Sequence, residues 1–348
     1  MGLFSGNKNE HTGLILGKQP SWLSLSESFK LTLENGQMEQ VCAVGESPEK
    51  MTTSSTTNRK EGEENNPGSS LLLKPDSSNE AVCSDGTENQ PEEEDNNKLS
   101  LISWNVDGLD EEEQPERARG LCSYLTSHSP DVVLLQELIQ PYTRFMKKRL
   151  AANYTFIEGG KGDYFIGMML KKSRITLLDS EIVAYPTTNM MRNLLVAQVL
   201  FKGHKLCLMT SHFESCKANA GERMRQLRLV MKMMAETPDD VTVLFGGDTN
   251  LRDAEVAKVG LPGCICDVWE QLGEPEHCHY TWDTHANTNK DHRFKSRFRF
   301  DRLYLRRAAT AGLPQLEPDS MALIGLEKLK CGCYTSDHWG VHCTFSAQ

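Results

Sequence analysis

The chain has 348 residues, of which 38% are hydrophobic and 25% charged, and its formal net charge is −10. This length is ample to bury a core, and it allows one large domain or two ordinary ones. It contains no apolar run of the roughly 18 residues that a membrane-spanning helix needs, which rules out such a span, and no secretory signal is expected at its start. The 11 cysteines, an odd number in a chain of this size, favour reduced thiols inside the cell over a disulfide scaffold.

The acidic charge is concentrated in the first quarter of the chain. Residues 1–97 hold 17 acidic and 7 basic residues, so they carry the whole net charge, whereas residues 98–348 are neutral on balance. Ser, Thr, Asn, Glu, Gly and Pro dominate residues 47–97, and such a stretch buries too little apolar surface to offset the entropy of ordering. We therefore expect a mostly disordered region over 1–97, in which any protein partners would bind, and a folded domain over 98–348.

Short apolar runs alternate with helical patterns through the second region. Two stretches, 118–125 and 220–234, repeat apolar residues at helical spacing. Eight runs rich in β-formers predict strands at 99–104, 132–135, 165–170, 195–201, 206–210, 241–245, 300–305 and 340–345. Mixed strands and helices over about 250 residues indicate one α/β domain with layered sheets.

Polar side chains stand at the ends of six of these predicted strands. A single Asp or Asn there is usually a turn residue or a cap, and for the pair Asp107-Gly108 alone the turn is the preferred interpretation. Six coincident cases favour a site instead, because strand ends are where α/β folds assemble their sites. The residues are Asn105, Asp107, Glu137, His212, Asp248, Asn250, Asp301, Asp337 and His338.

Four of these side chains offer hard oxygen ligands. Glu137, Asp107, Asp337 and Asn105 are the donor types that suit Mg²⁺, which keeps several waters and takes one or two protein carboxylates. Mn²⁺ is the alternative ion. No serine or thiol is recognisable as a nucleophile, so direct attack by water, assisted by a metal ion, is the chemistry that this set favours.

The remaining polar residues are suited to handling protons and phosphate oxygens. His212 and His338 can donate to phosphate oxygens, and His338 can be held in the required tautomer either by Asp301 or by the aspartate that precedes it. Asp248, together with Asn250, can orient or deprotonate a water. The alternative for His338 is a histidine that merely packs at a strand end.

Five short motifs occur in one order along the chain: Trp-Asn-x-Asp-Gly at 104–108, Leu-Gln-Glu at 135–137, Ser-His at 211–212, Gly-Asp-x-Asn at 247–250 and Ser-Asp-His-Trp-Gly at 336–340. Each is weak alone, but the ordered set resembles the endonuclease/exonuclease/phosphatase superfamily. The resemblance covers residues 98–348. It implies a DNase I-like, four-layer α/β sandwich in which helices flank two packed β-sheets.

Further segments, 190–194, 209–212, 248–253 and 280–284, resemble the 5′-tyrosyl-DNA phosphodiesterase branch of that superfamily. The resemblance implies Mg²⁺-dependent hydrolysis of the bond between a topoisomerase tyrosine and a DNA 5′-phosphate, which leaves a 5′-phosphate end for DNA repair. The implied partners are DNA 5′ ends that carry a topoisomerase-derived tyrosine or peptide. The implied location is the nucleus, with the cytoplasm as an additional one.

A basic segment accompanies these motifs. Residues 290–307 hold eight basic and two acidic residues, with aromatic residues interleaved, which is typical of a surface that binds single-stranded nucleic acid. The alternative is a solvated basic loop followed by a strand. The predicted phosphate contacts are Arg293, Lys295, Arg297 and Arg299. By position in the branch motifs, the resemblance adds Arg252, Tyr164, Trp282 and Ser215 as substrate or groove residues.

Two other functions remain open from the sequence. One is another hydrolase of the same superfamily, an abasic-site endonuclease or an inositol phosphatase. The other is a signalling or scaffold protein that acts through residues 1–97 and retains the fold for binding.

Overall fold

The computed structural model describes residues 97–347, so the expectation of a disordered region over 1–97 falls almost wholly outside the described residues. Two six-stranded sheets form the body. The first contains β13 (Leu316–Ile324), β14 (Gly340–Ala347), β1 (Lys98–Asn105), β2 (Val132–Leu138), β4 (Phe165–Lys171) and β3 (Tyr154–Glu158), in that spatial order.

The second sheet runs in the order β5 (Ile175–Ala184), β6 (Asn193–Phe201), β7 (His204–His212), β8 (Thr242–Asp248), β12 (Asp301–Arg306) and β9 (Cys266–Asp267). A separate two-stranded ribbon pairs β10 (Trp282–Asp283) with β11 (Arg297–Phe298). The eight predicted strands are all present, as β1, β2, β4, β6, β7, β8, β12 and β14.

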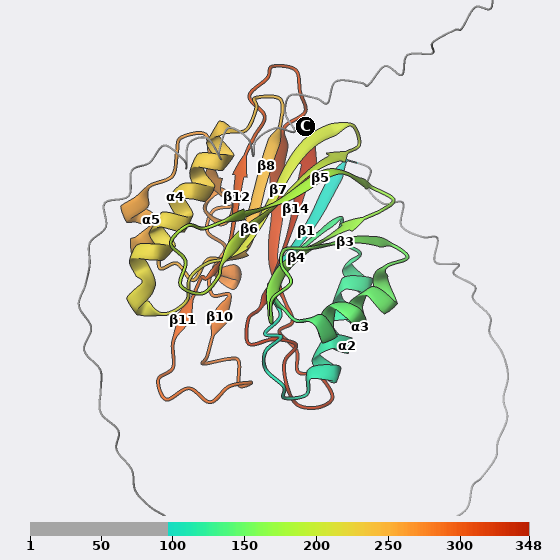
Figure 1. Cartoon of the computed structure of the whole chain (residues 1–348), viewed down its shortest axis with the longest axis vertical. Helices are drawn as coiled ribbons and strands as arrows, with labels where there is room; N and C mark the ends of the chain where they lie inside the picture. Colours follow the sequence, from blue (N-terminus) through green and yellow to red (C-terminus); the bar gives the residue numbers. More distant parts are fainter. Residues whose placement is uncertain (1–96, 348) are drawn as a thin grey trace, which may run out of the picture. The chain divides into compact units, whose positions relative to one another are not determined.

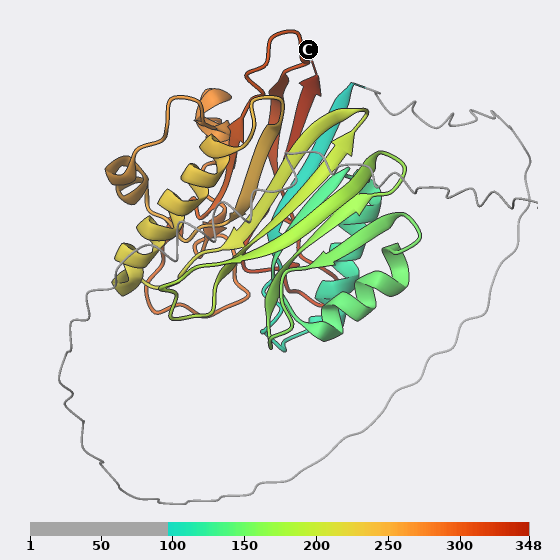
Figure 2. The same ribbon diagram turned by 45° about the horizontal axis from the view of Figure 1, so that its top comes forward.

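Helices cover the outer face of each sheet. The helices α2 (Gln114–His128) and α3 (Gln140–Leu150) lie on the first sheet, and α4 (Ala220–Glu236) with α5 (Asp253–Val259) lies on the second (Figures 1 and 2). The short α6 (Val268–Gln271) follows β9. The helices expected over 118–125 and 220–234 are α2 and α4.

Three apolar clusters hold these four layers together. One lies between the sheets and joins residues such as Leu101 of β1 to Leu208 of β7 and Leu244 of β8. The other two fill the interfaces between each sheet and its helices. The expected four-layer α/β sandwich is therefore confirmed.

The central strands are buried on both faces, which explains their nearly continuous apolar sequences. Along β1, Leu99 and Leu101 enter the cluster between the sheets, whereas Ile102 and Trp104 pack under the helices. The strand pairs β1–β2 and β7–β8 are parallel, and each needs a crossover, which α2 and α4 supply. Because the pairing is parallel, the carboxyl ends of β1 and β2 lie at one end of the first sheet, and those of β7 and β8 lie at one end of the second.

Within residues 97–347, no helix is long and apolar enough to cross a membrane.

Candidate active site

Strand register brings the predicted polar residues together. Asn105 at the end of β1 lies opposite Gln136 of β2, and His212 at the end of β7 lies opposite Asp248 at the end of β8. The antiparallel strand β12 begins at Asp301, directly opposite Asp248. The two sheets thus contribute neighbouring ends to one centre.

Asp248 is the hub of this centre, and it is buried. Its Oδ2 accepts a hydrogen bond from Asn105 Nδ2 at 2.9 Å and lies 3.3 Å from His212 Nε2 and 3.7 Å from His338 Nε2. Its Oδ1 accepts the backbone N–H of Asn250 at 2.9 Å. One carboxylate oxygen is therefore fixed by the backbone, and the other faces two imidazoles.

His338 is held as a charged donor. Its Nδ1 lies 2.9 Å from Asp301 Oδ2, so Asp301, of the two candidate aspartates, orients the ring. Burial alone would lower the pKa of His338, but the carboxylates of Asp301 and Asp248 outweigh burial and raise the pKa well above its usual value. Burial also raises the pKa of Asp248, to about 6, although the His338 charge opposes the shift.

His212, in contrast to His338, is held as a neutral imidazole. Burial, followed by the nearby Arg192 and His338 charges, lowers its pKa well below the usual value. Arg192 Nη1 donates to His212 Nδ1 at 2.9 Å, which leaves the ring proton on Nε2, the atom that faces Asp248. The centre therefore pairs a charged imidazole with a neutral one whose tautomer is fixed.

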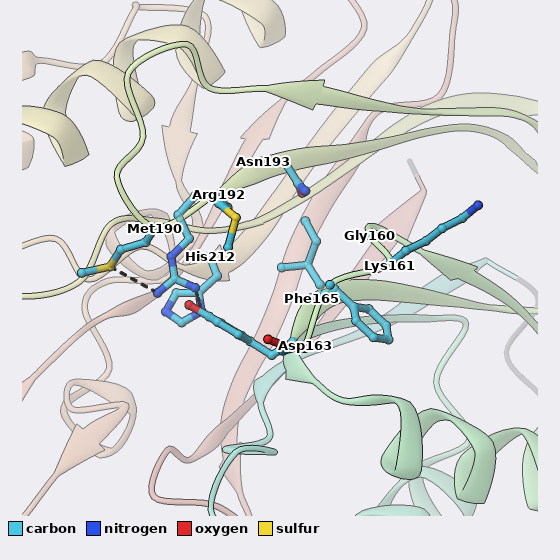
Figure 3. A pocket seen from close by; sticks show the side chains of 12 residues that line it. Gly160, Lys161, Asp163, Phe165, Met190, Arg192, Asn193 and His212 are labelled. Atoms are coloured by element: carbon cyan, nitrogen blue, oxygen red, sulfur yellow. Dashed lines mark hydrogen bonds between the residues drawn. The ribbon is translucent and has the colours of Figure 1, made fainter.

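A pocket of about 270 Å³ opens beside His212. Figure 3 shows Arg192 and His212 together in this pocket, with Lys161 pointing away from them. Arg192 also stacks on the Tyr164 ring, with its Cζ 5.0 Å from the ring centroid, and its Nη2 donates to Ser215 Oγ at 3.0 Å. Two residues expected to bind substrate, Tyr164 and Ser215, are thus joined through an arginine that the sequence reasoning did not select.

The acidic side of the centre contains Glu137, Asp107 and Asp337. Lys290 Nζ lies 2.6 Å from Asp107 Oδ1 and 3.5 Å from Asp337 Oδ2, and Arg117 Nη1 lies 3.5 Å from Asp107 Oδ2. A lysine therefore bridges two of the carboxylates that were predicted to hold a metal ion. Glu137 differs, because no lysine or arginine of the described chain lies within salt-bridge distance of it, and Asn105 Nδ2 donates to its Oε1 at 3.2 Å.

Two groups of side chains are candidates for holding a divalent ion. Ligand atoms of Asp248, Asp301 and His338 lie within 4.8 Å of one another, and His338 Nδ1 already contacts Asp301 Oδ2 at 2.9 Å. Glu137 instead faces an open groove of about 590 Å³ that it lines together with Asp107. The residues fit a divalent cation that keeps most of its waters and takes Glu137 as its anionic ligand.

Three residues of the centre have left-handed backbone conformations that are uncommon outside glycine. The φ angles are +48° at Asp107, +56° at Glu137 and +50° at Asn250. Such conformations are held by their surroundings and cluster at functional sites. Gly108 has a related reason, since a Cβ there would lie 2.3 Å from the Glu137 carbonyl oxygen. The Asp107-Gly108 pair is therefore more than a turn, because it lets the ends of β1 and β2 approach each other.

An aromatic platform lies next to the centre. The rings of Phe298 and Phe300 stack with centroids 4.9 Å apart, Trp282 lies 5.5 Å from Phe300, and Arg252 Cζ lies 5.1 Å from the Phe300 ring. Trp282 Nε1 donates to Asp337 Oδ2 at 3.4 Å, which ties the platform to the acidic side. Phe300 is buried, so the half-buried rings of Trp282 and Phe298 are the ones that can stack on unpaired bases.

The predicted phosphate contacts separate into two groups. Arg293, Lys295 and Arg297 are exposed on the β10–β11 loop and strand. The prediction for Arg299 is wrong, because Arg299 is buried and its Nη1 donates to both carboxylate oxygens of Asp267, at 2.9 and 2.7 Å. The pairing of β9 with β12, which brings Asp267 to this position, is not recognisable in the sequence.

Sequence reasoning also missed Arg192 and Lys290 as site residues. Both were visible, since Arg192 lies in the 190–194 motif and Lys290 begins the basic segment. Neither residue type nor position identifies a site residue by itself, because a basic residue in a loop is usually solvated.

The chain is similar to known proteins over most of its described residues. The Endonuclease/Exonuclease/phosphatase family matches residues 102–338. Tyrosyl-DNA phosphodiesterase 2 of Danio rerio is 59% identical over 280 residues, which cover 78% of this chain and 75% of that protein. The Homo sapiens protein of the same name is 53% identical over 253 residues, covering 72% and 69%.

A solved structure of a relative has a similar fold. The crystal structure of the D. rerio protein complexed with a single-strand DNA product is similar to this chain with a TM-score of 0.70 at 62% identity. The match covers 72% of this chain and 99% of that one.

Proposed function

The chain belongs to the endonuclease/exonuclease/phosphatase family, and on that premise we propose that it is a metal-dependent phosphodiesterase that hydrolyses the 5′-phosphotyrosyl bond between a topoisomerase tyrosine and DNA. The observation that carries the proposal is the arrangement around Asp248, where a charged and a neutral imidazole meet one carboxylate. That arrangement provides the groups needed to attack a phosphodiester with water. The similarity to tyrosyl-DNA phosphodiesterases supports the substrate.

Asp248 is placed to take the proton of the attacking water. Its Oδ1 is fixed by the Asn250 backbone and its Oδ2 by Asn105, so its orientation is set before substrate binds. The charged His338 and the Nε2–H of His212 face the same space and can donate to the non-bridging oxygens of the phosphate, where negative charge develops. The products are tyrosine and a DNA 5′-phosphate.

The leaving group needs little assistance. A phenol has a pKa of about 10, far below that of a sugar alcohol, so it can depart without a strong general acid. We propose Mg²⁺, with Mn²⁺ as a substitute, on Glu137, where it would supply a Lewis acid for the developing charge. The Tyr164–Arg192 pocket would receive the tyrosine side of the substrate and the aromatic platform its DNA side.

Two proposals concern the setting of the reaction. The products fit a role in DNA repair, and that role supports the nucleus as the location, with the cytoplasm as an additional one. Any protein partners would bind through residues 1–97, which carry the entire net charge of the chain.

The test uses the purified full-length chain and three substrates. In the presence of Mg²⁺, a single-stranded oligonucleotide with a 5′-phosphotyrosyl end should release tyrosine and leave a 5′-phosphate, and a chelator should stop the reaction. An abasic duplex and an inositol phosphate serve as controls for the two related activities. Faster cleavage of either control would assign the chain to another activity of its family, and no cleavage at all would favour a binding role.

A further inference from the structure

The proposed reaction uses only part of the pocket beside the centre. Tyr164 and Arg192 would receive the tyrosine ring, and two loops form most of the remaining lining. One loop, 160–163, joins β3 to β4, and the other contains Met190 and Met191 and leads into β6. Figure 3 shows Met190 against Arg192, whose Nη2 lies 3.8 Å from the methionine sulfur. The walls on either side of the bound tyrosine therefore have no role in the chemistry.

The methionine wall is held in a strained conformation. Met191 has a φ angle of +55°, and its side chain is 86% exposed, the highest value among the large apolar side chains of the described body. The loop is fastened by Glu214, which is fully buried. Its Oε1 accepts the backbone N–H groups of Asn189 and Met190, at 2.7 and 2.9 Å, and its Oε2 accepts the Thr188 hydroxyl at 2.8 Å. A buried carboxylate thus keeps a large apolar side chain in water beside the pocket, and strain of this kind clusters at functional sites.

The opposite wall offers backbone groups. Two of the four residues in the loop 160–163 are glycine. Among the described residues, none forms a hydrogen bond with the backbone N–H or C=O groups of this loop. Asn193 Nδ2 donates to the Gly159 carbonyl oxygen at 2.9 Å, which ties the start of the loop to β6 and fixes the two walls relative to each other. The pocket therefore has hydrogen-bonding backbone on one side and exposed methionine on the other.

This combination fits a polypeptide of no fixed sequence. Backbone N–H and C=O groups recognise the main chain of any peptide, and methionine is unbranched and polarisable, so it adapts to different side chains. A tyrosine that belongs to a protein is joined to residues on both sides, and those residues must leave the pocket between its two walls. The pocket that receives the ring is continuous with the surface that they would meet.

We infer that the loop 160–163 and the Met190–Met191 wall form a subsite for the polypeptide that flanks the tyrosine, and that Met191 provides its main apolar contact. The inference rests on the proposed function for the presence of the tyrosine in this pocket. It assigns a substrate larger than a single amino acid, in which the protein side contributes to binding independently of its sequence.

The test compares two conjugates of one fluorescent oligonucleotide, which carry at the 5′-phosphate either tyrosine alone or a blocked nine-residue peptide with tyrosine at its centre. Binding to the full-length protein is measured by fluorescence anisotropy in a chelator, where no cleavage occurs. The wild type should bind the peptide conjugate at least about fivefold more tightly, as expected for an apolar contact buried at an interface. In Met191→Ser the ratio of the two affinities should fall close to one, and Met191→Leu should retain it.

Leu326→Ser is the matched control, because it removes an exposed apolar side chain that does not line the pocket. It should retain the wild-type ratio. Equal affinities of the wild type for the two conjugates, or an undiminished ratio in a folded Met191→Ser variant, would overturn the inference.

A second peptide of unrelated sequence around the tyrosine tests the independence of sequence, and loss of the preference with that peptide would also contradict the inference. Tyrosine release in Mg²⁺ is measured separately on the conjugate with tyrosine alone. Release without any peptide preference would leave the proposed function standing and remove the subsite. A peptide preference that Met191→Ser abolishes, in a protein that releases no tyrosine, would support the subsite and contradict the proposed function.

Discussion

Three neighbouring side chains acquire different charge states from their surroundings. His338 stays protonated because Asp301 and Asp248 face it, whereas His212 stays neutral because it is buried beside Arg192. Asp248 lies between the two imidazoles and accepts a hydrogen bond from the Asn105 side chain. An acid, a base and a neutral donor are thus prepared at one point by burial and pairing alone, which is how active sites tune their groups.

The pH dependence of the reaction should reflect these charge states. The pKa of Asp248 is raised to about 6, so below that pH the carboxyl is protonated and cannot take a proton from water, and kcat/KM should rise as pH passes through about 6. The pKa of His338 is raised above its usual value, so activity should persist above neutral pH and fall only when that proton is lost.

Asp301→Asn should move the alkaline decline of kcat/KM to lower pH, because the variant removes the carboxylate that raises the pKa of His338 most. A pH profile of kcat/KM for both proteins measures this, and an unmoved alkaline limb would separate Asp301 from His338.

Glu137 should be essential for activity as the anionic ligand of the divalent ion. Glu137→Gln keeps the shape of the side chain and removes the charge that holds a divalent ion, so tyrosine release should fall by at least about 100-fold, as for other groups that stabilise developing charge. The side chain is partly exposed and makes no salt bridge with lysine or arginine in the described chain, so the melting temperature should change little. Turnover near the wild-type rate at saturating Mg²⁺ would remove Glu137 from the metal centre.

At the scale of elements, the site is a product of strand pairing. The central strands were predictable because burial on both faces makes them continuous apolar runs, and their polar ends identified Asn105, Glu137, Asp248 and His338. The strands that escaped prediction include β13, β3, β5 and β9, and these four are the edge strands. Edge strands carry exposed polar residues, as β5 does, so their sequences lose the apolar pattern.

Long-range pairing is what the sequence could not reveal. Whether a basic residue of the segment 290–307 meets solvent or a buried carboxylate depends on which strand lies beside it. Arg299 meets Asp267 because β9 joins β12, and Lys290 meets Asp107, 183 positions away in the chain. Residue type gave the chemistry of the centre, and only the fold gave the partners of its basic residues.

Arg297 and Arg299 should therefore respond differently to substitution. Arg299→Met leaves the buried Asp267 with Arg302, at 3.5 Å, as its remaining basic partner in the described chain, so the free energy of unfolding should fall by about 3 kcal/mol, the lower end of the cost of breaking a buried ion pair. Arg297→Ala should leave stability unchanged. It should instead weaken binding of a long single strand at low salt and reduce the log–log salt slope of KM by about 0.7. Denaturant titrations and KM measurements across salt concentrations distinguish the two, and equal destabilisation by both variants would contradict the assignment.

For the whole molecule, the net charge of the chain lies outside the residues that the structure describes. The described residues, 97–347, contain both sheets and every residue assigned to the centre. They are close to neutral, whereas the residues before them carry the net charge of −10. On the prediction that the basic loop of the body contacts DNA, we expect the acidic residues before the body to repel a polyanion and to leave the chemistry of the described centre unchanged.

Removal of residues 1–96 should accordingly leave the chemistry intact and change only electrostatics. On a short 5′-tyrosyl oligonucleotide, kcat should remain within about twofold of the full-length value, because the strand ends that position Asn105, Glu137, Asp248 and His338 all lie in the retained part. On a long strand at low salt, KM should fall, since the negative field is gone, and the difference between the two proteins should fade once the Debye length shortens to about 8 Å at physiological ionic strength.

Steady-state kinetics of both proteins over a salt series, with melting curves to verify folding, provide the measurement. A large loss of kcat in a folded truncated protein would mean that residues 1–96 help to build the centre, and an unchanged KM at low salt would mean that their charge never acts on DNA.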